Sequence, residues 1–493
     1  MHKPNYGFWS VLSGAMLSAC AVGPDYERPA VTIPSHFKEA SNDWKRAQPK
    51  QVEQTRWWES FQDPNLNFLE TQLLLSNQSI ATAEANYREA RALVDKARAS
   101  FFPTLSGLVN VTRSKASSSS GSTSATSGSA GKTITSQSLA LDASWEPDIW
   151  GAVRRAVEAS EANAEASAAL LAGTRLSAEA TLAQNYFQLQ TLDSTQRLLD
   201  DTLKNNRKLL KITQAQYKSG VASQADVKLA ESTLQTSEAD ALDNQIARAQ
   251  FEHAIAVLIG MAPAEFSLKT EGRLIPPPKI APMLPASLLE RRPDVAQAEQ
   301  VMVSANAEIG VAKAAYFPAL TFTASGGYAG QNLSHWISEP ALNWALGASL
   351  AETIFDGGLR SATVDAAWAT YEAEVASYRQ TILSAFQDVE DNLVSLRILA
   401  AEYEKRQAAA DSSKVAYELT IKQYQAGTVP LATVLTTANT LNTAQLSAVS
   451  VAGLRMSSAV GLIKALGGGW AGLELPECET HFYQIETAGQ EWG

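Results

Sequence analysis

The chain has 493 residues, of which 45% are hydrophobic, enough to bury a sizeable core, and this excludes disorder throughout. Lys and Arg number 40 against 51 Asp and Glu, a formal net charge of -11. With no excess of basic residues to contact phosphate groups, we expect no nucleic-acid partner.

The N-terminus predicts export and lipidation. A weakly charged head at His2 and Lys3 precedes an apolar stretch, and Leu17-Ser18-Ala19-Cys20 forms a small-residue processing site of the lipobox type. We expect residues 1–19 to be a signal peptide and Cys20 to carry several acyl chains, which together give durable anchoring. Ala21 follows Cys20 at the position where an aspartate would favour retention in the inner membrane. We therefore expect the protein to reach the outer membrane. The alternative is an ordinary signal peptide followed by a chance cysteine.

Beyond the signal peptide, no uninterrupted apolar run reaches the length of about 18 residues that a spanning helix needs. A membrane crossing would therefore use strands. The second cysteine, Cys478, has no disulfide partner if Cys20 carries lipid, so we assign it no role.

An internal repeat organises the chain. Gln216-Tyr217-Lys218-Ser219-Gly220 returns as Gln423-Tyr424-Gln425-Ala426-Gly427, 207 positions later. Phe101-Phe102-Pro103-Thr104-Leu105 returns after 215 positions as Tyr316-Phe317-Pro318-Ala319-Leu320, and Arg154 after 206 as Arg360. The first copy thus carries nine extra residues between these markers. The Ser/Gly-rich segment from Ser114 to Gly131 lies there, so we expect an exposed loop.

Both copies predict a helix, two strands, a very long helix, a tight turn and a returning helix. Strict alternation of apolar and polar residues places strands at about 104–112, 138–146, 319–328 and 343–354. Their length suits tilted transmembrane strands. Four strands cannot close a barrel, and open edges in lipid would leave backbone groups unpaired, so oligomerisation is implied. The alternative is a pair of soluble hairpins.

The long helices run from Gly151 to Tyr217 and from Gly358 to about Gln425, without proline, and each spans roughly 100 Å at about 1.5 Å per residue. Turns follow at 218–223 and 425–430, where Gly220 and Gly427 suit a left-handed helix end. Arg291-Arg292-Pro293-Asp294 opens the second copy, with proline at a helix start and charges that we expect to form salt bridges.

The predicted organisation follows from these landmarks. It comprises a signal peptide (1–19), a lipidated extended segment (20–62), repeat 1 (63–262), a proline-rich linker near the equator (263–286), repeat 2 (287–469) and a C-terminal tail (470–493).

Motifs spread over almost the whole chain resemble the outer membrane factor family, the TolC-like exit ducts, in its lipoprotein branch (NodT-type). The motifs are Cys20 with Gly23-Pro24-Asp25-Tyr26; Trp57-Trp58, Phe61 and Asp63-Pro64; Leu288-Leu289 and Arg291 to Val295; both Phe-Pro strand entries; Ile354-Phe355-Asp356-Gly357-Gly358; and Lys464 to Trp470.

The resemblance implies a mixed fold, in which a trimeric 12-stranded transmembrane β-barrel, with four strands from each chain, continues into a periplasmic α-helical tunnel. It implies an outer-membrane exit duct for drugs or other toxic compounds, gated at the helix tips. The implied partners are two further copies of this chain, outer-membrane lipid, a periplasmic adaptor and an inner-membrane pump of the resistance-nodulation-division class. The alternatives are a duct for type I protein secretion and a structural coiled-coil surface lipoprotein.

The resemblance also assigns roles at the two turns. Adaptor contact falls on Gly220, Val221, Ala222 and Ser223, and on Gly427, Thr428 and Val429. Thr433 and Thr436 stand where the family pattern carries aspartate, so an acidic ring from that helix is in doubt. Asp226 is the corresponding residue of the first copy, and Tyr217 and Tyr424 are candidates for hydrogen bonds that hold the tip closed.

No pattern in the chain predicts catalysis. The five histidines are scattered, and none has metal-ligand spacing to another histidine or a cysteine, so we expect no metal. Gly467, Gly469 and Gly472 fit a GxGxxG count but end a helix instead of joining a strand to one. We expect no enzymatic activity and no cofactor other than the lipid on Cys20.

Overall fold

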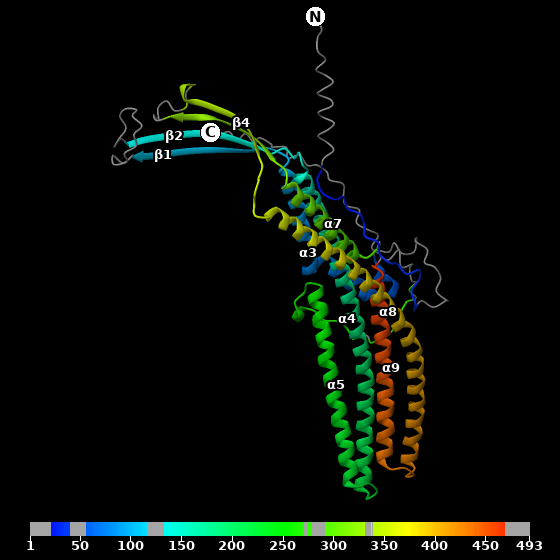
Figure 1. The fold of residues 1–493 in the computed structure, drawn as a ribbon. Coiled ribbons are helices and arrows are strands. Elements are labelled where there is room, and N and C mark those ends of the chain that lie inside the picture. Colours follow the sequence, from blue (N-terminus) through cyan, green and yellow to red (C-terminus); the bar gives the residue numbers. More distant parts are fainter. Residues whose placement is uncertain are drawn as a thin grey trace.

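A computed structural model describes residues 21–39, 56–115, 133–270, 272, 275–278, 280, 291–330, 337 and 339–468. The predictions for the signal peptide, Cys20, Cys478 and the C-terminal tail lie outside these residues. The described chain forms a long helical bundle with a four-stranded sheet extending from one end (Figure 1).

The first repeat begins with the short 3-10 helix η2 (Trp57–Phe61), followed by α2 (Pro64–Ser76) and α3 (Gln78–Ala99). We expected a single helix before the first strand, and this was wrong. Helix α2 ends just before Asn77. The side-chain oxygen of Asn77 accepts the Ile80 N–H at 3.0 Å and so caps the start of a new helix. Helix α3 has a counterpart of equal length, 215 positions later, in α7 (Pro293–Ala314), which begins at a proline as expected.

The sheet contains β1 (Thr104–Lys115), β2 (Thr133–Trp145), β3 (Ala319–Gly330) and β4 (Leu342–Ala351), all antiparallel in chain order. Strands β1 and β2 are longer than predicted because their pairing continues to Lys115 and Thr133.

Strand β4 ends at Ala351, three residues before the predicted end at 354. Ala351 pairs with Ala319, the first residue of β3, so no partner strand remains beyond it. The next two residues turn instead toward Arg360, which donates to the Glu352 carboxylate and to the Thr353 carbonyl.

In the half of the sheet next to the bundle, one face is apolar across all four strands, whereas the far end of β1 and β2 carries Arg113, Lys115 and Gln137 on the same side. Directly opposed residues share a face, and the register aligns Gly107 with Leu141, Trp145 with Phe322 and Ala324 with Leu346. The other face carries the polar partners of the predicted alternation: Thr104, Ser106, Asn110, Ser138, Asp142, Ser144, Thr321, Thr323, Ser325, Asn343 and Ser349. A sheet with this pattern suits lipid on one side and water on the other.

The two helical hairpins are copies in length and register. Helices α4 (Ala152–Lys218) and α8 (Leu359–Gln425) each have 67 residues, and α5 (Gln224–Leu258) and α9 (Leu431–Ala465) each have 35. All four boundaries are separated by 207 positions. Arg154 and Arg360 are 206 positions apart, so they are one position out of this register. Each nevertheless pairs with an aspartate before its helix, Asp148 or Asp356, and the two arginines therefore have the same role.

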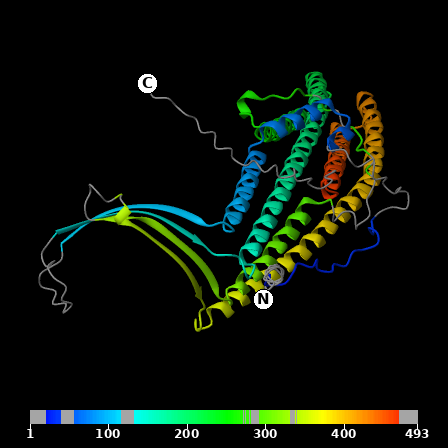
Figure 2. The ribbon, with the colours of Figure 1, turned by 90° about the horizontal axis from the view of Figure 1, so that it is seen from above.

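The hairpins pack side by side in the order α5, α4, α9, α8, since α4 contacts both α5 and α9, and α9 contacts α8 (Figure 1). Helix α7 packs against α4 and α8 at the sheet end, and the sheet curves away from this junction (Figure 2). The short 3-10 helices η3 (Pro263–Glu265) and η4 (Glu339–Ala341) complete the described elements.

The largest core lies near the middle of the molecule, where η2 and α2 pack on α4. Side chains from α5 and α9 join it. We call this cluster the equatorial core, and its members include Trp57, Trp58, Phe61, Leu66, Leu69, Leu73, Leu182, Tyr186, Phe187, Leu189, Ile255, Ile259, Met456 and Val460.

Helix α9 is long and apolar enough, by length and composition, to cross a membrane. It lies in the middle of the bundle between α4 and α8, and the core helix of a soluble bundle passes the same test. We therefore assign α9 to the bundle.

Candidate functional site

The end of the bundle opposite the sheet consists of two equivalent turns, 219–223 and 426–430 (Figure 1). Gly220 and Gly427 have φ values of 78° and 75°, the left-handed conformation that ends a helix with least strain in glycine. Their N–H groups donate to the carbonyls of Tyr217 and Tyr424, both at 3.0 Å. The predicted helix ends are therefore confirmed in both copies.

The two turns differ in how the returning helix is capped. Ser223 and Asp226 form a capping box at the start of α5: the Asp226 carboxylate accepts the Ser223 N–H at 2.9 Å, and the Ser223 hydroxyl accepts the Asp226 N–H at 3.1 Å. Hydrogen bonds from Ser223 lower the pKa of Asp226 below its ordinary value. At the equivalent positions of the second copy, Pro430 provides no side-chain cap and Thr433 is exposed.

This capping box is a feature that our sequence reasoning missed, although the Ser-x-x-Asp spacing was visible. The Asp226 carboxylate is occupied locally, by the backbone and hydroxyl of Ser223. Thr436 is occupied too, because its hydroxyl donates to the Ala432 carbonyl one turn earlier at 2.9 Å.

The two tyrosines of the repeat have different environments. Tyr424 is buried in a cluster between the hairpins, and its hydroxyl donates to the Gln216 side-chain oxygen. Tyr217 is 47% exposed and has no side-chain hydrogen bond within the described residues. Of the two tyrosines, therefore, only Tyr424 joins α8 to α4 by a side-chain hydrogen bond between described residues.

The cluster around Tyr424 fastens the tips together. It combines Leu209 of α4, Ala230 of α5, and Leu431, Val434 and Leu435 of α9, and Val429 packs against its edge. The other predicted adaptor-contact residues lie at the surface of the turns; Val221 is 76% exposed, and Gly220, Ser223, Gly427 and Thr428 are exposed. Ala222 is half-buried. The turn residues thus form two accessible loops on a shared apolar base.

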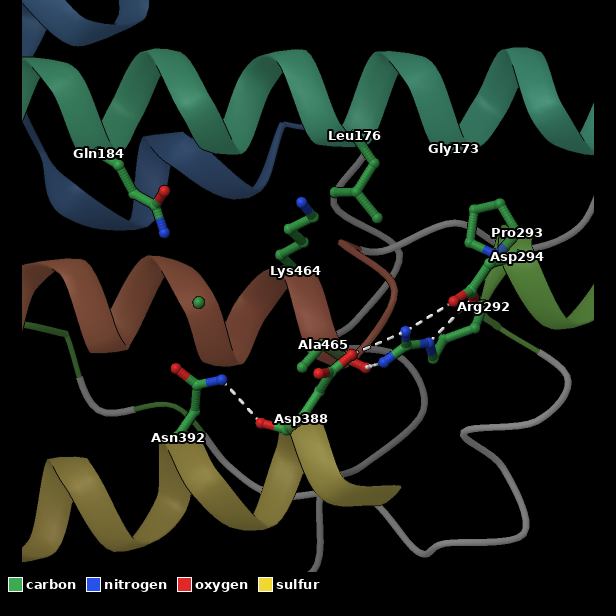
Figure 3. Close-up of a pocket in the computed structure, with 11 residues that line it drawn as sticks. Gly173, Leu176, Gln184, Arg292, Pro293, Asp294, Asp388, Asn392, Lys464 and Ala465 are labelled. Atoms are coloured by element: carbon green, nitrogen blue, oxygen red, sulfur yellow. Dashed lines mark hydrogen bonds and ion pairs between the residues drawn. The ribbon is translucent and has the colours of Figure 1, made fainter. Parts of the chain in front are cut away.

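Near the middle of the bundle, a cavity of about 340 Å³ lies between α4, α8 and α9 beside the start of α7 (Figure 3). The buried Arg292 guanidinium donates to Asp294 at 2.7 Å, to Asp388 at 3.0 Å and to the Ala465 carbonyl at 3.2 Å. Lys464 donates to the Ser177 hydroxyl at 3.2 Å. Because these cations have partners within the chain, the cavity offers little to an anionic ligand. The predicted structural salt bridges are confirmed for Arg292 and Asp294.

Residues 21–39 form an extended strap along α7 and α8. Asp25 pairs with Arg155 at 2.7 Å, and Arg28 pairs with Glu299 at 2.6 Å. Further along, Phe37 is buried against α8, and the Lys38 N–H donates to Glu390 at 2.7 Å. The strap begins one residue after Cys20, close to the start of α4, where the Val22 N–H donates to the Trp150 carbonyl at 3.0 Å.

Among the described residues, no three His, Cys, Asp or Glu side chains are grouped so that they could hold a metal ion. Instead, the described chain has an amphipathic sheet at one end and a helical tip with two accessible loops at the other. This combination defines an outer-membrane channel that extends into the periplasm as a helical tunnel.

Comparison with known proteins gives the family. The model of the outer membrane efflux proteins matches residues 69–261 and 284–468, and the chain belongs to this family.

Individual relatives match along most of their length. The pyoverdine export outer membrane protein OpmQ of Pseudomonas aeruginosa is 32% identical, over 92% of this chain and 95% of its own. The toluene efflux pump outer membrane protein TtgC of Pseudomonas putida is 28% identical, over 92% and 94%. The probable outer membrane lipoprotein SilC of Salmonella typhimurium is 27% identical, over 92% and 97%.

Solved structures agree. The outer-membrane channel OprN superposes with a TM-score of 0.83 at 27% identity, covering 92% of this chain and all of its own. The open state of the Neisseria gonorrhoeae MtrE channel gives 0.77 at 27% identity, over 92% and 99%. The chain is thus an outer-membrane efflux channel, with the predicted trimeric barrel and helical tunnel. Channels of this family are trimers that work with an adaptor and an inner-membrane pump.

Proposed function

We propose that this protein is the lipid-anchored exit duct for small toxic compounds, which a pump of the resistance-nodulation-division class delivers through a periplasmic adaptor. The observation that carries the proposal is the continuity of an amphipathic sheet with two hairpins built on 67-residue helices. Relatives named for pyoverdine, toluene and cation efflux support a small-molecule cargo. We further propose that the duct is passive, without enzymatic activity or a cofactor beyond its lipid.

The proposed anchor is an acylated Cys20. The strap at residues 21–39 supports it, because ion pairs at Asp25 and Arg28 would hold this segment against the upper bundle next to the acylated residue. An anchor and a barrel in the same membrane would then limit rotation of the chain.

The proposed gate is the contact between the two hairpin tips. Within one chain the strongest candidate is Tyr424, whose buried hydroxyl joins α8 to α4. Tyr217, Asp226, Thr433 and Thr436 remain candidates for contacts between chains at the threefold axis. We expect Asp226 to contribute mainly by ordering its turn, since its carboxylate is bound to Ser223.

The proposed adaptor surface consists of the loops Gly220–Ser223 and Gly427–Val429. Both lie at the end of the bundle that points away from the sheet, as an adaptor approaching from the inner membrane would require (Figure 1). Added side chains at Gly220 and Gly427 would meet no atom within 4 Å, so the glycines serve the backbone conformation and leave room for a partner helix.

The test is gene deletion with complementation in the native host. Deletion should raise sensitivity to several dyes, detergents, antibiotics or metal ions, and the wild-type gene should restore resistance. Complementation with Cys20→Ser should restore less, because the unlipidated chain reaches the outer membrane less efficiently. Unchanged sensitivity across a broad panel, together with lost secretion of a protein substrate, would replace efflux by type I secretion.

A further inference from the structure

Glu70 of α2 has a fully buried side chain, at 0% relative exposure, within the equatorial core. Neither of its carboxyl oxygens has a hydrogen-bond partner among the described residues. The same is true of the side-chain oxygen of Asn67, three residues earlier and therefore on the same face of the helix. Buried acceptors thus gather on one face of α2 without a donor.

The charged group that acts on Glu70 is another carboxyl, Glu179 of α4. Glu179 is 8% exposed, accepts the Trp57 indole N–H from η2 at 2.9 Å, and lies one turn after Arg175. The partly buried cations of α5 and α9 are engaged elsewhere, because Arg248 pairs with Asp193 and Glu252 and Arg455 lies over the Tyr403 ring. In the described part of the chain, no lysine or arginine offsets a charge on Glu70.

Burial, followed by the charge of Glu179, raises the pKa of Glu70 to about 10. Burial also raises the pKa of Glu179, to about 7, although Trp57 and Arg175 favour its charged form. A carboxylate only accepts hydrogen bonds, whereas a protonated carboxyl supplies one O–H donor. Protonation of Glu70 therefore removes a buried charge and provides the donor that this face of α2 lacks.

We propose that Glu70 is a proton-binding site of the equatorial core, which holds α2 against α4 while it is protonated and loosens this packing when it loses its proton. The candidate acceptors for the donated O–H are the unpaired side-chain oxygen of Asn67, on the same face of α2, and the carboxylate of Glu179, whose charge acts on Glu70.

The direction of the pH dependence follows from linkage. The pKa of Glu70 in the folded protein lies above its ordinary value of 4.5, so the folded state binds more protons between about pH 4.5 and about pH 10. The contribution of Glu70 to stability is therefore complete below its ordinary pKa and is lost as the pH rises through the folded pKa. Glu179 adds a dependence of the same sign at lower pH, up to about 7.

The test compares the purified full-length protein with Glu70→Gln, a neutral amide that mimics the protonated carboxyl in shape. Chemical unfolding between about pH 5 and about pH 9 should show that the unfolding free energy of the wild type falls as the pH rises. Its slope against pH should be steeper than that of the variant, by up to the amount that one additional proton bound in the folded state produces. Glu59→Gln, at an exposed position in η2, is the matched control and should behave like wild type.

Infrared spectroscopy gives a second readout. At about pH 8.5, where Glu179 is ionised, the C=O stretch of a protonated carboxyl should be present in wild type and absent in Glu70→Gln, and it should vanish from wild type at strongly alkaline pH. If that variant does not fold, Glu179→Gln serves instead, and removal of the neighbouring charge should shift loss of the band to lower pH. Equal pH dependence in wild type and Glu70→Gln, or no protonated band in wild type at about pH 8.5, would overturn the proposal.

Discussion

The hydroxyl of Tyr424 on α8 donates a hydrogen bond to the side-chain oxygen of Gln216 on α4, so that the two helical hairpins are joined near their tips. The repeat makes Tyr217 the counterpart of Tyr424, yet Tyr217 is largely exposed within the chain. The internal symmetry of the sequence is thus broken at the site that we propose as the gate.

Tyr424→Phe should increase current through the resting channel. The change keeps the ring in its apolar cluster and removes one buried hydrogen bond, worth about 0.5–1.5 kcal/mol in each chain. Tyr217→Phe is the matched control, because Tyr217 makes no side-chain hydrogen bond within the described part of one chain. Single-channel recording should show a higher resting open probability for Tyr424→Phe; equal effects of the two variants would locate the important contact between chains instead.

Ser223→Ala should loosen the start of α5 without changing the charge at the tip. Loss of the cap costs about 0.5–2 kcal/mol, and the amides of Asp226 and its neighbours should exchange faster. Thr433→Ala, at the position equivalent to Asp226, should leave exchange in α9 unaltered because no side-chain cap exists there. Faster exchange in both variants, or in neither, would contradict this account of the two turns.

The same capping box gives the tip a pH dependence. The pKa of Asp226 is lowered in the folded state, so its contribution is present above its ordinary value of 3.8 and is lost as the pH falls through the folded pKa. Hydrogen exchange at the start of α5 should therefore rise in strongly acidic solution, and Asp226→Asn should show raised exchange at all pH values. An acidic gate ring would instead appear as altered cation selectivity in Asp226→Asn with normal exchange.

Neighbouring residues on β2 should respond in opposite ways to arginine. Leu141 lies on the apolar face, where an arginine near the bilayer midplane costs about 2–4 kcal/mol, so Leu141→Arg should reduce insertion into the outer membrane. Asp142 lies on the polar face, and Asp142→Arg should insert normally and shift ion selectivity toward anions. Membrane fractionation and reversal potentials measure the two effects; the reverse outcome would mean that the faces are assigned the wrong way round.

Phe37→Ala should release the lower part of the strap from α8. Phe37 is 3% exposed and packs on Phe386 with ring centroids 6.4 Å apart, and removal of a buried phenylalanine side chain costs about 3–5 kcal/mol. Residues 35–39 should then become accessible to limited proteolysis. Ile33→Ala, at a site that is 44% exposed, should leave the digestion pattern unchanged. Similar digestion of both variants would show that Phe37 does not fasten the strap.

The features that could be predicted from the sequence have a local pattern that is present in both copies of the repeat. Alternation located all four strands, and the glycines at 220 and 427 located both turns, because strand faces and left-handed helix ends restrict the residues that can occupy them. The break at Asn77 and the cap formed by Ser223 and Asp226 also have local signals, and these could have been found by searching systematically for helix caps.

Other features depend on which helices meet and have no local signal. The 207-residue repeat makes Tyr217 and Tyr424 equivalent, and only the packing of α4, α5 and α9 around Tyr424 distinguishes them. Glu70 looks like an ordinary charged helix residue in the sequence, and only the packing of η2 and α4 against α2 accompanies its complete burial. The pairing of Arg292 with Asp388, 96 positions away, likewise requires the tertiary fold.

The most direct test of the channel assignment is planar-bilayer recording of the purified protein, combined with measurement of its mass in detergent. We predict a trimer that produces discrete conductance steps, because three sheets of four strands close the barrel that one sheet leaves open at β1 and β4. A folded, stable monomer that never conducts would contradict the account.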